Sequence, residues 1–498
     1  MFQPLFSYKN LFEAIQTALE ACLRQPKNGP PATKPAAQSP QFLVFRYLCS
    51  VMMNWKTLLS DCRLGKEGEP RSQNELRTDF QRDYDRLIFS SAFRRMQNKT
   101  QVFPLPGSIF VHNRLTHSLE VSSVGRSLGH DVARRLSADP ARRESLPPDF
   151  AESLAAIVSA AALAHDMGNP PFGHSGERAI RSFFTDGDGA RYRGLVSEAE
   201  WADLTRFDGN ANTFRLLTHQ FEGRREGGFV MTYSTLAALV KYPWSASIAG
   251  EKSKFGFFEA ERDTYRRIAA ALGIEGGETE GGALRYVRHP LVYLVEAADD
   301  ICYEIMDIED AYKLRLLSAD ETFSLLLGFF TADEQQRLRD RYAKGTDEGD
   351  RVVYLRSCVV GALERAAVDI FVEHEQEILA GTLRGSLVDR LPEPLHSAYR
   401  RCAEIAVSRI YNCKEVLDID LAGYHIIYTL LGLMTEAVMN PSKAYSRLLL
   451  GQASSQYQLR APGIYDRLMA VVDYLSGMSD VFALDLYRKI NGHSLPMV

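Results

Sequence analysis

The stretch LAAIVSAAALAHDMGNPPFGHSGE, residues 154–177, decides the fold. Small and apolar residues fill its first half, which is typical of a helix that is buried on all sides. Four ionisable side chains then follow within thirteen positions: His165, Asp166, His174 and Glu177. Because unpaired charges are costly to bury, we expect these groups to be paired, bound to a metal or exposed in a cleft.

The composition narrows the class of protein. The chain has 498 residues, of which 45% are hydrophobic and 24% charged, and this balance predicts a globular protein with a sizeable core. The net charge of −5 argues against a protein that coats nucleic acid, but it leaves room for a local basic pocket. Seven scattered cysteines without a CxxC pair indicate reduced thiols and a cytoplasmic location. No apolar run approaches the roughly 20 residues of a membrane span, so we expect no membrane association.

Helical periodicity dominates from about residue 74 onward, and strand-like alternation is rare, so the sequence predicts an all-α protein. The Gly-rich segment 273–283 predicts a surface loop. The Pro-rich segment 24–40 predicts a linker, and residues 1–52 form an extension that is either disordered or an artefact of start-codon choice. The predicted helical segments are 114–136, 151–166, 289–314, 352–380, 395–410, 422–439 and 463–490.

Three of these segments carry residues that could converge on one point. His117 lies on an apolar helix face, where taken alone it fits a core histidine better than a ligand. His165 and Asp166 end a helix before Pro170, and they fit a local ion pair and a pair of ligands equally well. Asp299 points inward from an apolar stripe, and burial without a cation would neutralise such a carboxylate.

Together these four residues would form a mixed nitrogen and oxygen site for a divalent metal with open positions. The absence of thiolates leaves Mg, Mn, Fe, Co and Ni as candidates. A metal with open positions can polarise a phosphoryl oxygen or lower the pKa of a bound water, so the pattern favours hydrolysis without naming a substrate.

The sequence around these residues is more specific. From about residue 54 to 496 it resembles the bacterial deoxyguanosine triphosphate triphosphohydrolases (dGTPases), a family of HD-domain metal-dependent phosphohydrolases. The words that carry the resemblance are HNRLTHSLEV (112–121), HDMGNPPFGHSGE (165–177), FDGNANTFR (207–215), LVKYPW (239–244), EAADDICYEIMDIEDA (296–311) and LSGMSDVFALDLYRKING (475–492).

The resemblance implies an all-α fold, with an HD core at about 110–315 and a C-terminal helical region at about 316–498, inside a dGTPase-like domain that spans 53–498. It implies hydrolysis of deoxynucleoside triphosphates, with dGTP preferred, to the deoxynucleoside and intact triphosphate by water attack at the α-phosphorus. The implied cofactor is Mg²⁺ or Mn²⁺, with Co, Ni or Fe not excluded. The implied metal ligands are His117, His165, Asp166 and Asp299.

The resemblance also implies roles for other residues. His174 and Glu177 match the catalytic pair, and their spacing of three suits one helix face. Asn169 is a departure, because related nucleotide hydrolases outside the bacterial branch carry a histidine there. The substrate-binding matches are Arg114, Lys241 and Tyr242 for the phosphates, Tyr303 and Asp307 for the sugar, Gln101 for the base or sugar, and Asn210, which an Asn-Gly loop cap explains equally well.

The expected partners are a deoxynucleoside triphosphate, further copies of the chain in a homo-oligomer such as a hexamer, and single-stranded DNA. Two other functions compete with this interpretation. One is another HD-domain phosphohydrolase, acting on nucleoside monophosphates or guanosine alarmones. The other is a regulatory protein that senses nucleotides or single-stranded DNA with residual activity. Intact triphosphate among the products would separate the dGTPase from both.

Overall fold

The structure is a computed structural model that describes residues 52–69, 76–103, 111–342 and 347–493. The fold described below belongs to the unit Met53–Val498. The predicted linker 24–40 and nearly all of the predicted extension lie outside the described residues.

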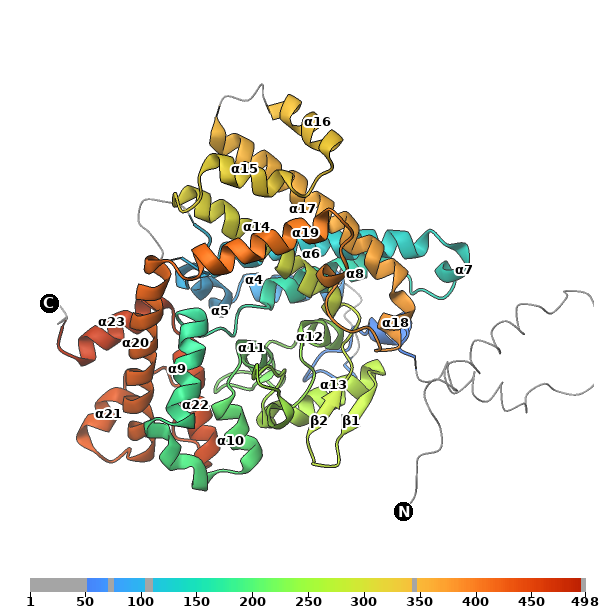
Figure 1. The fold of residues 1–498 in the computed structure, drawn as a ribbon. Helices are drawn as coiled ribbons and strands as arrows, with labels where there is room; N and C mark the ends of the chain where they lie inside the picture. Colours follow the sequence, from blue (N-terminus) through green and yellow to red (C-terminus); the bar gives the residue numbers. More distant parts are fainter. Residues whose placement is uncertain (1–51, 70–75, 104–110, 343–346, 494–498) are drawn as a thin grey trace, which may run out of the picture. The chain divides into compact units, whose positions relative to one another are not determined.

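Three helices form the centre of this unit: α6 (Arg114–Ser137), α8 (Phe150–Ala164) and α14 (Val292–Lys313). Each of the three contacts the other two, and α17 (Glu348–Glu373) covers α6 and α14 (Figure 1). Among the described residues, the strands β1 (Gly276–Glu278) and β2 (Leu284–Tyr286) form an antiparallel hairpin, and the rest is helix and loop. The prediction of an all-α fold is therefore confirmed.

The other helices surround this centre. The α-helices are α3 (Trp55–Leu58), α4 (Asp79–Ile88), α5 (Ser91–Arg95), α7 (Pro140–Arg143), α9 (Gly173–Thr185), α10 (Glu198–Thr205), α11 (Gly209–Thr218), α12 (Tyr233–Leu239), α13 (Arg262–Leu272), α15 (Ala319–Leu327), α16 (Ala332–Tyr342), α18 (Glu375–Leu379), α19 (Leu395–Ile405), α20 (Lys414–Met439), α21 (Ala444–Leu450), α22 (Ile464–Ser476) and α23 (Asp480–Ile490). The short helical turns are η2 (Met96–Asn98), η3 (Asp188–Leu195), η4 (Ala246–Ile248), η5 (Glu259–Glu261), η6 (Val388–Arg390) and the π-helical η7 (Ala406–Ile410).

Small residues explain how closely α6 and α8 pack. A Cβ atom added at Gly129 of α6 would lie 3.0 Å from the carbonyl oxygen of Leu154 in α8. Most of the apolar residues of α8 are buried, as its composition predicts. The close approach places the end of α8 beside the start of α6, which is where the ionisable residues of the opening stretch begin.

The chain breaks where the prolines predict. Helix α8 ends at Ala164 and α9 begins at Gly173, after Pro170 and Pro171. The residue before α9, Phe172, has a φ of 60°, and that of Gly173 is 54°. A left-handed conformation is unfavourable for a bulky residue such as Phe172, so the surrounding structure must hold it in place.

Three predicted segments are divided or paired differently in the structure. The single helix predicted over 463–490 is divided into α22 and α23, because Ser479 caps a new helix by accepting a hydrogen bond from the backbone N–H of Phe482. The helix predicted over 352–380 is divided at His374. The Gly-rich segment 273–283 contains β1, which pairs with β2 instead of forming an open loop.

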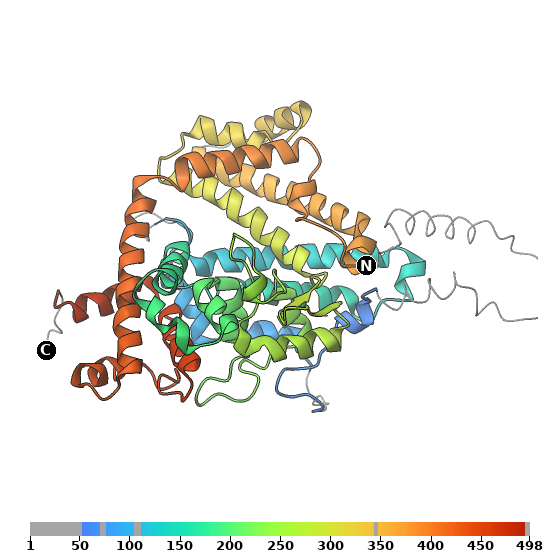
Figure 2. The same ribbon diagram turned by 60° about the horizontal axis from the view of Figure 1, so that its bottom comes forward.

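Among the described helices, α20 is long and apolar enough to cross a membrane, by length and composition only. The sequence analysis predicts a helix over 422–439, and α20 begins earlier than that, at Lys414. Its C-terminal half is buried through residues such as Ile427 and Leu431, and the helix contacts α9, α21, α22 and α23 (Figure 2). Core helices meet the same criterion, so this feature is weak evidence for a membrane span.

Candidate active site

Three residues from distant parts of the chain meet in one group: His117 on α6, His165 just after α8, and Asp299 on α14. Their candidate ligand atoms all lie within 4.8 Å of one another. Asp299 Oδ1 is 3.0 Å from His117 Nε2 and 3.4 Å from His165 Nε2. Two imidazole nitrogens and a carboxylate oxygen are donors that suit a divalent metal, so the residues present fit such an ion.

The local backbone orients the second of these ligands. His165 Nδ1 lies 2.7 Å from the carbonyl oxygen of Ala162, which can only accept, so Nδ1 carries the proton and Nε2 faces Asp299. Burial lowers the pKa of His165, but the charges of Asp166 and Asp299 outweigh burial and raise it to about 9. Burial raises the pKa of Asp299, but His165 and His117 hold it well below its usual range.

Asp166 lies at the side of this group. Its Oδ2 accepts a hydrogen bond of 2.6 Å from Arg114, and its Oδ1 accepts one from Asn169 and is 3.6 Å from His165 Nε2. Burial raises the pKa of Asp166, but Arg114 outweighs burial and lowers it. The carboxylate is therefore within reach of the histidine but is also paired with the guanidinium of Arg114.

A cavity of about 320 Å³ opens beside these groups, and most of the predicted site residues line it. Two predicted residues do not. His117 contributes to the ligand group without lining the cavity, and Asp307 is buried and accepts a hydrogen bond of 2.8 Å from the Tyr411 hydroxyl. The predicted residues that line the cavity are Gln101, Arg114, His165, Asp166, His174, Glu177, Asn210, Lys241, Tyr242, Asp299 and Tyr303.

The predicted catalytic pair lies at the start of α9, where Glu177 is buried and His174 is exposed. Glu177 is buried, and its Oε1 accepts a hydrogen bond of 2.8 Å from the Gly209 backbone N–H. Its Oε2 lies 3.1 Å from His174 Nδ1 and 3.3 Å from Arg181. Burial raises the pKa of Glu177, but the His174 hydrogen bond and nearby cations lower it to about 2. The ionised carboxylate thus holds His174 by Nδ1, while 72% of that imidazole side chain is exposed.

Two polar side chains of the cavity, Lys241 and Asn210, contact carboxylates, whereas Gln101 does not. Lys241 Nζ is 3.2 Å from Glu296 Oε1, and it lies 5.9 Å from the centre of the Tyr242 ring. Asp208 caps α11 by accepting from the Asn210 backbone N–H, and Asn210 Nδ2 donates to the same carboxylate. Gln101 Oε1 is buried and has no hydrogen-bond partner among the described residues, so it is available to a ligand.

Sequence reasoning missed several residues of the cavity. Lys254 lines it, with Nζ 3.4 Å from Asp208 Oδ2, but it lies in an irregular segment that gives no periodic signal. Glu296 could have been found, because it precedes Asp299 by three positions and therefore shares its helix face. Asp300 and Tyr399 line the cavity as well.

Comparison with known proteins identifies a domain and a family for this chain. The family model of the HD domain matches residues 114–269. A deoxyguanosinetriphosphate triphosphohydrolase-like protein of Pseudomonas aeruginosa (strain LESB58) is 39% identical over 464 residues, which cover 89% of this chain and 100% of the relative. One from Synechocystis sp. (strain ATCC 27184 / PCC 6803 / Kazusa) is 36% identical over 457 residues, with the same coverage.

A deoxyguanosinetriphosphate triphosphohydrolase of Yersinia enterocolitica (serotype O:8 / biotype 1B, strain NCTC 13174 / 8081) is 30% identical over 501 aligned positions, covering 86% of this chain and 96% of the relative. The HD domain together with the group of His117, His165 and Asp299 indicates a divalent metal. The chain therefore belongs to the deoxyguanosinetriphosphate triphosphohydrolase-like family and is an HD-domain phosphohydrolase related to the dGTPases.

Proposed function

We propose that this protein is a metal-dependent hydrolase of deoxynucleoside triphosphates that prefers dGTP and releases the deoxynucleoside and intact triphosphate. The observation that carries the proposal is the convergence of His117, His165 and Asp299 beside a cavity that also holds three cationic side chains. The reaction is attack of water on the α-phosphorus.

The metal site would consist of His117, His165 and Asp299, with Asp166 at its side. The proposed ion is Mg²⁺ or Mn²⁺, and Co, Ni or Fe fit the same donors. When bound, such an ion polarises a phosphoryl oxygen and lowers the pKa of water.

The triphosphate would be bound by Arg114, Lys241 and Lys254, each of which faces the cavity. Every one of these cations contacts a carboxylate: Arg114 contacts Asp166, Lys241 contacts Glu296, and Lys254 contacts Asp208. These carboxylates hold the cations around the cavity before substrate arrives, and charge-assisted hydrogen bonds to phosphate oxygens would then add to the pairs.

The nucleoside would be bound by Tyr303, Asp307 and Gln101. The Tyr303 ring lines the cavity and lies edge-on to His117, so it can crowd a 2′ hydroxyl and select against ribonucleotides. Asp307 would supply an acceptor to the 3′ hydroxyl through the oxygen that Tyr411 does not bind, and the substrate would have to reach it beyond the residues that line the cavity. The unpartnered Gln101 Oε1 can accept a hydrogen bond from the base or the sugar.

His174 would transfer protons in the reaction. Because Nδ1–H donates to Glu177, Nε2 is the nitrogen that can accept a proton from the attacking water. The buried Glu177 holds the ring and stabilises the imidazolium that forms. The neighbouring Asn169 cannot take over this role, since an amide does not titrate.

The test is incubation of the purified protein with each dNTP and NTP in Mg²⁺ or Mn²⁺, with chromatographic separation of products. Release of intact triphosphate, fastest from dGTP and absent in Asp299→Ala, is the expected result. Pyrophosphate or inorganic phosphate as the first product would instead identify another HD-domain phosphohydrolase. A protein that binds dNTPs without turnover would be a regulatory sensor.

The proposed assembly is a homo-oligomer such as a hexamer, acting in the cytoplasm and binding single-stranded DNA. Light-scattering mass on the purified chain tests the first part, and a monomer with full activity would contradict it. Fluorescence anisotropy with a labelled oligonucleotide tests DNA binding.

A further inference from the structure

The turn between α22 and α23 lies in the motif LSGMSD, residues 475–480. The proposed reaction assigns no role to these residues. The last residue of the motif, Asp480, is buried. One carboxylate oxygen accepts a hydrogen bond of 2.8 Å from the Thr100 backbone N–H, and the other accepts one of 2.9 Å from the Phe172 backbone N–H. A single side chain therefore connects two segments that lie far apart in the sequence.

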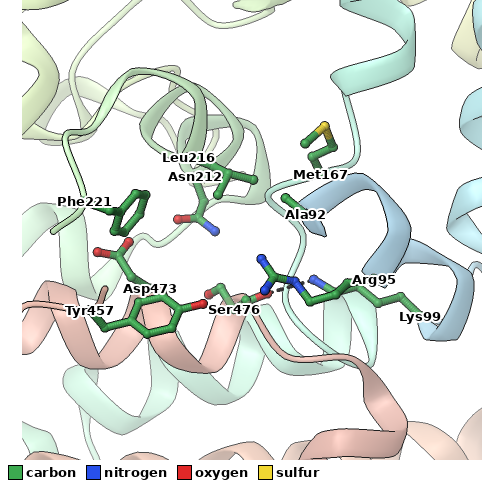
Figure 3. Close-up of a pocket in the computed structure, with 11 residues that line it drawn as sticks. Ala92, Arg95, Lys99, Met167, Asn212, Leu216, Phe221, Tyr457, Asp473 and Ser476 are labelled. Carbon is green, nitrogen blue, oxygen red and sulfur yellow. Dashed lines mark hydrogen bonds between the residues drawn. The ribbon is translucent and has the colours of Figure 1, made fainter. Parts of the chain in front are cut away.

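Lys99 makes the complementary contacts. Its side chain is buried, and Nζ donates to the carbonyl oxygens of Asn169 at 2.6 Å and of Ser476 at 2.8 Å. Figure 3 draws Lys99 and Ser476. Burial lowers the pKa of this lysine to about 7, although the charge of Asp480 opposes the shift. The lysine thus binds two carbonyl groups and the aspartate two N–H groups.

Three of these four backbone groups, those of Thr100, Asn169 and Phe172, belong to segments that reach the candidate active site. Asn169 and Phe172 lie in the loop that joins His165 to His174. Thr100 precedes Gln101, and the Lys99 carbonyl oxygen accepts a hydrogen bond of 3.2 Å from the backbone N–H of Arg114, the first residue of α6. The loop, the start of α6 and the turn after α22 are joined through these two side chains.

Residues near the start of the loop have further hydrogen bonds, because the Gly168 N–H donates to the Thr213 hydroxyl and Asn212 Nδ2 donates to the Gly168 carbonyl oxygen. Met167 of the loop faces a small cavity that Lys99 and Ser476 also line, as the close-up in Figure 3 shows. The loop then ends on the left-handed Phe172, a conformation that persists only where the surroundings fix it. The Phe172 N–H that donates to Asp480 is part of that fixation.

We propose that Lys99 and Asp480 are positioning residues of this hydrolase site, which set the loop 167–173 and thereby the place of His174 relative to Asp299. Neither side chain lines the catalytic cavity, so both act through the backbone groups that they bind. The proposal rests on the proposed function, because its kinetic consequence needs a reaction to measure.

The experiment compares Asp480→Asn with Asp485→Asn in the full chain; Asp485 is a half-buried position on the same helix, paired with Lys489 at the surface. Hydrogen exchange is followed in peptides that cover 99–101 and 167–175, together with the melting temperature, Mn²⁺ affinity and dNTP kinetics. We expect faster exchange in both peptides of Asp480→Asn, a kcat at least about tenfold lower, since small misplacements of catalytic groups cost this much, and Mn²⁺ affinity within about twofold. Asp485→Asn should match the parent in every measurement.

A folded Asp480→Asn protein with parental exchange, or with parental kcat, would overturn the proposal. If this variant does not fold, Lys99→Met and Lys99→Arg decide the question, because arginine retains donors for the two carbonyls and should recover part of the kcat that methionine loses. Equal kcat in those two variants would overturn it as well. Failure of the proposed function is distinguishable, since the parent protein would then release no triphosphate, whereas failure of the positioning role leaves the parent active and its exchange unchanged by the substitutions.

Discussion

Helix α14, which carries Asp299, also buries the carboxylate of Glu304, and the effect of this burial on the unfolding free energy can be measured. Glu304 of α14 follows Tyr303 and is 7% exposed. Its Oε1 is buried without a hydrogen-bond partner among the described residues. Burial raises the pKa of Glu304 from 4.5 to about 7. Replacement by glutamine keeps the shape and removes the charge that this environment disfavours.

The magnitude follows from the two pKa values of Glu304. The folded pKa is above the unfolded one, so its stabilising contribution is complete below pH 4.5 and is lost as the pH rises through about 7. The difference corresponds to about 3 kcal/mol of unfolding free energy at pH 8. With about 2 cal/mol/K of unfolding entropy per residue over Met53–Val498, this equals about 3 °C in melting temperature.

The assay is thermal unfolding of the parent and of Glu304→Gln at pH 5 and pH 8. The variant should unfold at nearly the parent's temperature at pH 5 and about 3 °C above it at pH 8. Glu373→Gln, at an exposed position of α17, is the control and should show no such pH dependence. If the melting temperatures of Glu304→Gln and the parent differed by the same amount at pH 5 and pH 8, the reasoning would be refuted.

Three further substitutions test the site and the packing around it. His174→Ala should lower turnover by about 10²–10⁴-fold, the usual contribution of a general base, and leave Mn²⁺ binding by calorimetry unchanged; parental turnover would exclude the catalytic pair. Lys254→Met should raise the KM for dNTPs by about tenfold, through loss of one charged contact of roughly 1.4 kcal/mol, whereas Lys252→Met, at an exposed neighbour, should not. Gly423→Ala should destabilise the protein by about 1–3 kcal/mol, because the added Cβ would lie 2.5 Å from the side chain of Phe172. Gly432→Ala on the same helix, with 3.8 Å of clearance, should be neutral or stabilise by up to about 1 kcal/mol in thermal unfolding.

The sequence predicts the central helices well because their hydrophobic periodicity is strong. It predicts that Asp299 faces inward, since its neighbours at helical spacing are apolar, and the structure brings this residue to His117 and His165. The break between α8 and α9 is predicted by two prolines, whose chemistry is local. Such features can be predicted from a short stretch of sequence, because they depend on neighbouring residues alone.

Features that depend on distant contacts could not be predicted. Lys254 faces the cavity from an irregular loop, and no local pattern reports where that loop docks. The pairing of Asp166 with Arg114 depends on how α6 approaches the end of α8. Asp307 lies at the expected spacing on α14, but Tyr411, more than a hundred positions later, occupies its carboxylate.

The residues that meet around Asp299 and the residues Lys241 and Lys254 come from different stretches of chain. Helices α6 and α14 and the residue that ends α8 supply the group around Asp299, and the chain further on, before α14, supplies the two lysines. Substitution of either lysine can alter how an anionic ligand is held while the two imidazoles and the carboxylate stay in place. Contacts to an anionic ligand can therefore change in this scaffold without a new ion-binding centre having to arise.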